Sequence, residues 1–188
     1  MDAHISALVR GCFYQLRQLK TIIGSLIKSA AGTLVHAFIH SRLDYCNDLL
    51  FGISDVQIRR QQPVQNASAR LVTGRHCWEH VTPSLLSLHW LPVRQRVQYK
   101  IAMTVFRCLS KTAPLYLCDL CRPLNTLSRT SSLRSHSLSC LHVPRTNTKY
   151  GKRAFSVAGP AVWNSLRNPD VNELTFAKIA FGAFVIVE

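Results

Sequence analysis

Apolar side chains recur about every four residues along one stretch in the middle of the chain, between Pro92 and Leu109. This spacing places them on one face of a helix, because 3.6 residues complete a helical turn. Pro92 suits the start of that helix, since its φ is already helical and the amide that it lacks would be unpaired in a first turn. The predicted buried face consists of Val93, Val97, Ile101, Val105 and Leu109, widened by Thr104 and Cys108.

The same periodicity predicts further helices on both sides of this stretch. Apolar steps of three or four residues indicate one helix from His4 to about Lys20 and a second from Leu26 to about Leu43. A third begins at Ser54 or Asp55 and extends to Thr73. We expect a break within it at Pro63, because an interior proline costs about 3 kcal/mol. Short helices are predicted over 83–88, from Thr112-Ala-Pro114 through Leu120, and over 161–166.

The composition of the sequence changes after Arg122: serine, threonine, arginine and asparagine dominate as far as Asn147. Such a composition favours a basic, partly irregular segment, with Leu138 to Val143 as the part best suited to an extended strand. The fold class predicted is therefore mainly α, a helical bundle followed by a basic segment with a little possible β. The domains expected are a thumb-like helical region over 1–121, a basic segment with a short terminal helix over 122–166, and a divergent tail over 167–188.

The charge of the chain is strongly one-sided, with 23 Lys and Arg against 9 Asp and Glu, a formal net charge of +14. Asp119 is the only carboxylate between His80 and Pro169. An excess of this kind favours an anionic partner, such as nucleic acid or an anionic membrane, although a solvated basic surface has the same composition. The most apolar segment, Ile179 to Val187, is too short to span a bilayer, so no membrane partner is expected.

Two groups of cations are candidates for binding nucleic acid. The first lies on the polar side of the helix after Pro92, where no carboxylate is placed to form i,i+4 pairs; it contains Arg94, Arg96 and Lys100. The second, Arg145, Lys149, Lys152 and Arg153, alternates with small hydroxyl residues around Tyr150. Lysine and arginine suit phosphate contacts, and an exposed aromatic ring suits stacking. A solvated loop predicts the same residues.

The seven cysteines are an odd number with no secretion signal before them, which favours free thiols in a reducing compartment. The expected location is therefore intracellular, either nuclear or cytoplasmic. An alternative function is a small zinc-stabilised module for protein contacts, with Cys118, Cys121, Cys140 and His142 as ligands. Stoichiometric zinc in protein purified without added metal would favour that alternative.

Catalytic signatures are missing from the sequence. No glycine-rich phosphate loop and no G-x-S-x-G stretch occurs, and the acidic residues are scattered singly. The nearest acidic pair, Asp44 and Asp48, fits a polar helix face better than a site for the two metal ions of a polymerase. We therefore expect neither catalysis by this chain alone nor a cofactor.

Five stretches stand out together, in this order: H-S-R-L-D-Y-C-N-D-L-L-F-G (His40 to Gly52), V-Q-N-A-S-A-R-L-V-T (Val64 to Thr73), H-V-T-P-S-L-L-S-L-H-W-L-P-V-R-Q-R-V-Q-Y-K-I (His80 to Ile101), A-P-L-Y-L (Ala113 to Leu117) and R-A-F-S-V-A-G-P-A-V-W-N-S-L (Arg153 to Leu166). They resemble the carboxy-terminal region of reverse transcriptases, the RNA-directed DNA polymerases, of jockey-like non-long-terminal-repeat retrotransposons. The resemblance covers nearly the whole chain up to Leu166.

The resemblance implies a non-catalytic fragment, because the catalytic aspartates of that family lie in an upstream palm domain. The chain would hold the thumb-like helices and the segment beyond them, which grip the backbone of RNA and of an RNA–DNA template–primer duplex beside the palm domain. Met1 is then an internal methionine of a longer reading frame. Gln61 and Pro63 replace a leucine and a basic residue of the relatives, and the sequence departs again after Leu166, as expected of a decayed copy.

Overall fold

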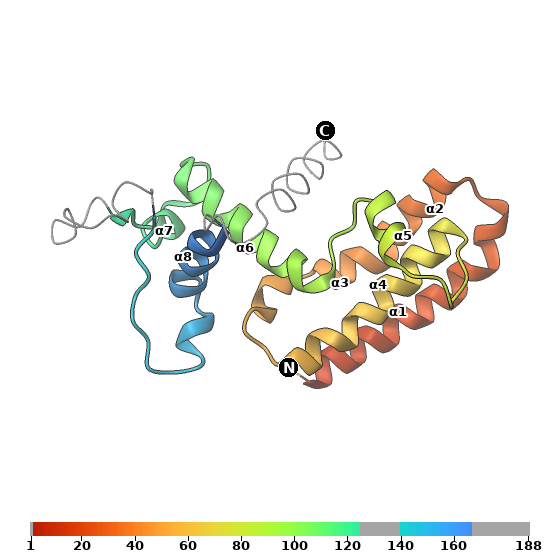
Figure 1. The fold of residues 1–188 in the computed structure, drawn as a ribbon, viewed down its shortest axis with the longest axis horizontal. Coiled ribbons are helices and arrows are strands. Elements are labelled where there is room, and N and C mark those ends of the chain that lie inside the picture. The colour runs from red at the N-terminus through yellow and green to blue at the C-terminus, as the bar shows by residue number, and fades with distance from the viewer. Residues whose placement is uncertain (1, 125–139, 167–188) are drawn as a thin grey trace. The chain divides into compact units, whose positions relative to one another are not determined.

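The computed structural model describes residues 2–124 and 140–166, and the described part is built from helices (Figure 1). The elements are α1 (Asp2–Ile22), η1 (Ile23–Ser25), α2 (Lys28–Val35), η2 (His36–His40), α3 (Ser41–Asp44), η3 (Asn47–Leu50), α4 (Asp55–Thr73), α5 (Thr82–Ser87), α6 (Val93–Leu109), α7 (Leu115–Cys118), η6 (Gly151–Arg153) and α8 (Phe155–Leu166). The predicted mainly α fold class is confirmed.

Extended structure in the described ranges is limited to one antiparallel bridge between Pro123 and Leu141. Leu124 N–H donates to the Cys140 carbonyl at 2.9 Å, and His142 N–H donates to the Arg122 carbonyl at 2.9 Å. The predicted extended segment therefore meets a partner at Leu141, while its first residues, 138 and 139, lie outside the described residues.

The chain forms two compact units, Met1–Arg96 and Val97–Glu188, which divide within α6. The predicted boundary after Cys121 stays a prediction, and the tail over 167–188 lies outside the described residues. Each unit has its own apolar core, so each is described by itself.

In the first unit, α1 packs along α4 (Figure 1). The predicted apolar face of α1 is buried at Cys12, Leu16 and Leu19, and it meets the buried face of α4 at Val64, Ala69 and Val72. Each large aliphatic side chain buried in this way stabilises the fold by about 1.5–3 kcal/mol. The remaining buried members of this core are Val35, Ile39, Leu43, Leu85 and Trp90.

The helix predicted from Leu26 to Leu43 is present as α2, η2 and α3 in direct succession. Its middle part, η2, is a π-helical turn in which the Ser41 N–H donates to the His36 carbonyl, five residues earlier. A π-turn widens the helix by one residue and often marks a functional or strained position. Here it brings two histidines, His36 and His40, to the same side of the helix, with their Nδ1 atoms 3.3 Å apart.

The predicted break at Pro63 is wrong, because α4 runs through it from Asp55 to Thr73. Pro63 and Arg59, whose carbonyl loses its amide partner, are both exposed. Water can therefore replace the missing hydrogen bond, and the proline ring points away from the core. The helix ends at Gly74, whose φ of 69° suits glycine, and the Gly74 N–H donates to the Arg70 carbonyl.

In the second unit, the core forms where α6 meets residues from the end of the described chain. Val105, Cys108, Cys121 and Leu141 are buried together, with Phe155 and Trp163 packed against them. The predicted face of α6 is confirmed at Val97, Ile101 and Val105, whereas Leu109 is 38% exposed at the helix end. Short helices are present at α5 and α7, close to their predicted positions.

The final helix, α8, begins at Phe155, six residues before the predicted start at Ala161. Pro160 lies inside α8 and is buried, although it removes the amide that would otherwise donate to the Ser156 carbonyl. Farther along α8, the Asn164 side chain holds the bridge strand: its Oδ1 accepts from the Leu141 N–H at 2.9 Å and its Nδ2 donates to the Leu141 carbonyl at 2.8 Å.

Candidate nucleic-acid interface

The first two predicted phosphate-binding residues, Arg94 and Arg96, lie in the first turn of α6 and each pairs with a carboxylate from a distant part of the chain. Arg94 pairs with Asp55 at the start of α4. Arg96 Nη1 lies 3.2 Å from Asp44 Oδ1, and only 14% of the Arg96 side chain is exposed. No carboxylate stands within the helix, but the fold supplies two from elsewhere. In this structure both guanidinium groups are already engaged.

Two glutamines of α4 hold the chain where α6 begins. Gln62 Oε1 accepts a hydrogen bond from the Val93 N–H at 3.0 Å, which satisfies an amide that a helix start leaves unpaired. Gln65 Nε2 donates to the Leu91 carbonyl at 2.6 Å. Together with the Arg94 and Arg96 pairs, these bonds fix the first turn of α6 within the first unit.

A buried polar cluster lies beside the Arg96–Asp44 pair. Trp90 packs edge-on against the rings of His36 and His40, with centroids 5.4 Å and 4.1 Å away. Burial lowers the pKa of His40 to about 2, and the nearby Arg96 and His36 act in the same direction. Burial also lowers the pKa of His36, a shift that Arg96 reinforces and Asp44 opposes. Both histidines are therefore neutral near pH 7.

The chemistry open to this cluster is limited by Arg96. Burial lowers the pKa of the Arg96 guanidinium, while the charge and hydrogen bond of Asp44 oppose that shift. An arginine remains cationic nonetheless, so a metal cation beside the two imidazoles would face like charge. No group of three or more metal-ligating side chains occurs among the described residues. We therefore interpret the cluster as structural.

The remaining predicted phosphate-binding residues lie in the second unit. Arg145, Lys149 and Lys152 are exposed, whereas Lys100 on α6 and Arg153 in η6 are partly buried. Tyr150, in the same loop, is 83% exposed. The structure thus brings four of the predicted cations, Arg145, Lys149, Lys152 and Arg153, into one loop with an open aromatic ring.

This loop is compact, and two threonines shape it. Thr148 Oγ1 accepts a hydrogen bond from the Gly151 N–H at 3.0 Å, and the Thr148 carbonyl accepts from the Lys152 N–H at 3.3 Å. A Cβ at Gly151 would lie 3.2 Å from the Thr146 Cβ, so the turn has little room for a larger residue. Arg145, Lys149, Lys152 and Tyr150 are left on the outside of this turn.

The two units differ in how their charges are balanced. Residues 2–96 carry 11 Lys and Arg with 5 Asp and Glu, and four of these five acids pair with an arginine. The described residues of the second unit carry 8 Lys and Arg with a single acid, Asp119. The described part of the second unit therefore has the higher ratio of basic to acidic residues.

The four proposed zinc ligands are not brought together. Cys121 is 4% exposed within the second core, and burial raises the pKa of its thiol to about 12, with smaller contributions from Cys108 and Cys118. Cys118 and Cys140 are partly buried, and His142 is exposed. A cysteine binds zinc as the thiolate, and a thiol with a raised pKa disfavours that form. Among the described residues, no group of three or more His, Cys, Asp or Glu side chains could hold a metal ion.

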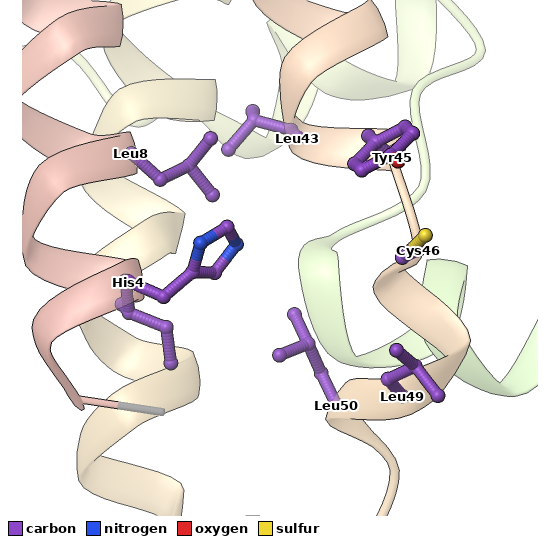
Figure 2. A pocket seen from close by; sticks show the side chains of 8 residues that line it. His4, Leu8, Leu43, Tyr45, Cys46, Leu49 and Leu50 are labelled. Atoms are coloured by element: carbon purple, nitrogen blue, oxygen red, sulfur yellow. The ribbon is translucent and has the colours of Figure 1, made fainter.

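A small pocket of about 50 Å³ lies between the start of α1 and the segment after α3 (Figure 2). Figure 2 shows His4 and Leu8 of α1 facing Leu43 and Leu50 across it. Its lining holds no Lys, Arg, Asp or Glu, and its volume is far below the roughly 300–1,000 Å³ of ligand pockets. The pocket is too small and too apolar to receive a nucleotide.

Sequence reasoning found the cations but missed their partners. Asp44 and Asp55 lie 52 and 39 residues before the arginines that they pair with. No local spacing rule connects residues so far apart, because helical i,i+4 pairing covers only one turn. No sequence pattern indicated the roles of Gln62 and Gln65, which bond Val93 and Leu91.

Comparison with known proteins adds no assignment. No protein-family model, no curated protein and no solved structure matches the chain. Among the described residues, no helix combines the length and the apolar character needed to cross a membrane.

Proposed function

We propose that this chain is the post-palm, carboxy-terminal part of a jockey-like retrotransposon reverse transcriptase, and that it grips the backbone of RNA and of RNA–DNA duplexes. By itself the chain catalyses nothing, and the gene that encodes it is a decayed genomic copy of the retrotransposon. Its ancestral protein partner is the upstream palm domain of the parent enzyme, and it acts inside the cell, in the nucleus or cytoplasm. The helical fold of the described residues is compatible with thumb-like helices.

The observation that carries this proposal is the exposed basic loop of the second unit. Arg145, Lys149 and Lys152 project from a compact turn in a unit whose described residues include one acid. Lysine and arginine that lack competing carboxylates release counterions when they neutralise phosphates, which drives association with nucleic acid. This mode of binding depends on charge and spacing, and it reads no base sequence.

The roles of the seven predicted residues divide along the two units. Arg94 and Arg96 pair with Asp55 and Asp44, so we assign them to holding the first turn of α6. Arg145, Lys149, Lys152 and Arg153 carry the phosphate contacts, with Lys100 as a further contributor from α6. The A-form duplex offers phosphates and 2′-hydroxyls, whereas side chains cannot read its deep major groove.

The salt dependence of binding tests the proposal. Anisotropy of a labelled RNA–DNA duplex is measured over a range of salt concentrations for the parent and for the Arg145→Ala, Lys149→Ala, Lys152→Ala, Arg153→Ala quadruple variant. Each lost phosphate contact should reduce the slope of log affinity against log salt by about 0.9, so the quadruple variant should flatten it by roughly three to four units. The quadruple variant should lose affinity equally for duplexes of different base sequence.

A matched pair of double variants controls for net charge. Lys149→Ala with Lys152→Ala removes two exposed cations, and Arg60→Ala with Arg94→Ala removes two ion-paired ones. The first pair should flatten the slope by about two units and the second by less than one. Val97→Ala, which removes a buried side chain, should lower the melting temperature instead. Equal slopes for the parent and the folded quadruple variant would contradict the proposal.

Polymerase activity is the second test. Nucleotidyl transfer needs carboxylates that converge on two metal ions about 4 Å apart. Among the described residues no group of three or more such ligands is assembled. Purified chain should therefore incorporate no deoxynucleotides on a primed RNA template, and measurable incorporation would overturn this part of the proposal.

A further inference from the structure

Trp78 is the most exposed of the three tryptophans, with 76% of its surface accessible to solvent. It lies in the loop between α4 and α5, and the His76 ring stacks on it with centroids 4.4 Å apart and planes 4° from parallel. One face of the indole is therefore covered by an imidazole, and most of the remaining surface meets solvent. The result is a flat aromatic platform with an open side.

Glu79 holds the loop that carries this platform. Its carboxylate accepts a hydrogen bond from the His76 N–H at 3.0 Å, and its own N–H donates to the His76 carbonyl at 3.3 Å. Its carbonyl accepts from Arg70 Nη2 at 3.1 Å, which ties the loop to α4. These bonds fix the chain on both sides of Trp78, and the His76 ring contacts one face of its indole.

Two arginines contact Glu79, the residue that follows Trp78. Arg70, at the end of α4, reaches the loop, and Arg75 lies 3.8 Å from the Glu79 carboxylate with 40% of its side chain exposed. Glu79 is the only acid between Gly74 and the start of α5. An open aromatic ring beside arginines fits a ligand that is planar and anionic at the same time.

We propose that Trp78, backed by His76, stacks an unpaired base of single-stranded RNA or DNA. The inference rests on the proposed function, since nucleic acid is the ligand in both, but it names a different residue set and a single-stranded form of the ligand. Bases within a duplex are already stacked on their neighbours, so the platform selects single strands.

The shape of this surface favours a base over a protein partner. Aromatic anchors of protein interfaces fill pockets of the partner and are ringed by contacts that exclude water. Trp78 is instead flanked on one side by a coplanar ring, which leaves room for one further planar group on the other. Stacking of this kind accepts any base, because every base has a π-face.

Tryptophan fluorescence tests the proposal directly. Trp90 is 7% exposed, so a ligand that stacks on Trp78 should quench the exposed indole preferentially. A single-stranded oligouridylate should quench it, whereas an abasic strand of equal length and charge should bind without quenching. Trp78→Phe should remove the quenched signal, and Trp78→Ala should weaken single-strand binding roughly 5- to 150-fold.

The matched control is Tyr45→Ala. Tyr45 is 75% exposed, as open as Trp78, but stands between Asp44 and Asp48 in the sequence. This variant should keep the parent's affinity for single strands. Trp78→Ala should keep the slope of log affinity against log salt, because no phosphate contact is removed, and it should keep the affinity for duplex.

Three outcomes decide between the two proposals. If base-bearing and abasic strands quench alike, or if folded Trp78→Ala keeps the parent's single-strand affinity while the quadruple loop variant loses salt dependence, the platform is refuted and the proposed function stands. If the parent binds neither strand, both fail. If Trp78→Ala weakens the affinity for base-bearing single strands, and Tyr45→Ala does not, the platform is supported.

Discussion

Arg96 on α6 donates to the carboxylate of Asp44 at the end of α3, across 3.2 Å and 52 residues of sequence. The same Asp44 oxygen accepts from Asn47 Nδ2 at 3.2 Å. Arg96 is the more enclosed partner, with 14% of its side chain exposed against 31% for Asp44. The pair therefore joins two helices that are far apart in sequence, and solvent barely reaches its guanidinium group.

This asymmetry predicts unequal effects of removing either partner. Asp44→Ala leaves the enclosed guanidinium unpaired and should reduce the free energy of unfolding by about 3 kcal/mol, the lower end for a broken buried pair. Arg96→Met leaves a carboxylate that water can reach, and it should cost less, about 1 kcal/mol. Urea unfolding of both variants and of the double variant measures the difference. An equal or larger loss for Arg96→Met would contradict this interpretation.

His40 predicts that the fold is sensitive to acid. Its pKa in the folded chain is about 2, well below the ordinary value of 6.5, mainly because of burial. Between those two pH values the unfolded chain binds more protons than the folded chain, so stability is complete above pH 6.5 and declines as the pH falls. A drop from pH 7 to pH 5 should lower the free energy of unfolding by about 2 kcal/mol through this residue.

The control for this pH dependence is His40→Met, which keeps an apolar contact for Trp90 and removes the titrating group. Groups that face His40 are His36 on its own helical segment, and Trp90 and Arg96 from the chain around the start of α6; Asp44 acts on His36. His36 should leave a smaller residual slope of the same sign, since its pKa is lowered too. If urea unfolding shows the parent's full pH dependence in His40→Met, the assignment to His40 is wrong.

Helices were the predictable part of this fold. The apolar periodicity that places Val97, Ile101 and Val105 on one face is a local property, and burial of that face follows from it. Prolines were harder, because their effect depends on what surrounds them. Pro63 is exposed and stays within α4, where water can bond the freed carbonyl, whereas Pro160 stays within α8 although it is buried.

The site was predictable only in its composition. The one-sided charge identified Lys149 and Lys152, and the structure leaves both exposed. Arg94 and Arg96 have the same local sequence features, yet the fold gives each of them a carboxylate. Which cations keep their charge available is decided by contacts between residues far apart in sequence, and no pattern within a helix encodes those contacts.

Gln61 predicts a stabilising substitution. It is fully buried on α4, and neither its Oε1 nor its Nε2 has a hydrogen-bond partner among the described residues. Gln61→Leu removes two desolvated polar atoms and should raise the free energy of unfolding by about 1–3 kcal/mol. Gln65→Leu, the same change at another buried position of α4, should lower it, because the Leu91 carbonyl would lose its donor. Thermal and urea unfolding of both variants give the comparison, and opposite signs are the expected result.

Gly159 predicts a steric limit within the second unit. A Cβ at this position of α8 would lie 3.0 Å from Val105 Cγ2 and 3.2 Å from Phe155 Cε2. Val105 is fully buried and its branched side chain has little freedom to move, so overpacking should outweigh the helix preference of alanine. Gly159→Ala should therefore destabilise the protein by about 1 kcal/mol after the gain in helix propensity is counted.

Gly32→Ala on α2 is the matched control, since nothing lies within 4 Å of the added Cβ. There the helix preference of alanine acts alone, and the variant should be more stable by up to about 1 kcal/mol. Combining Gly159→Ala with Val105→Ala supplies the missing space, so the two losses should sum to less than additivity predicts. Additive losses in the double variant, or a stabilised Gly159→Ala, would show that α8 does not approach α6 as closely as these atoms indicate.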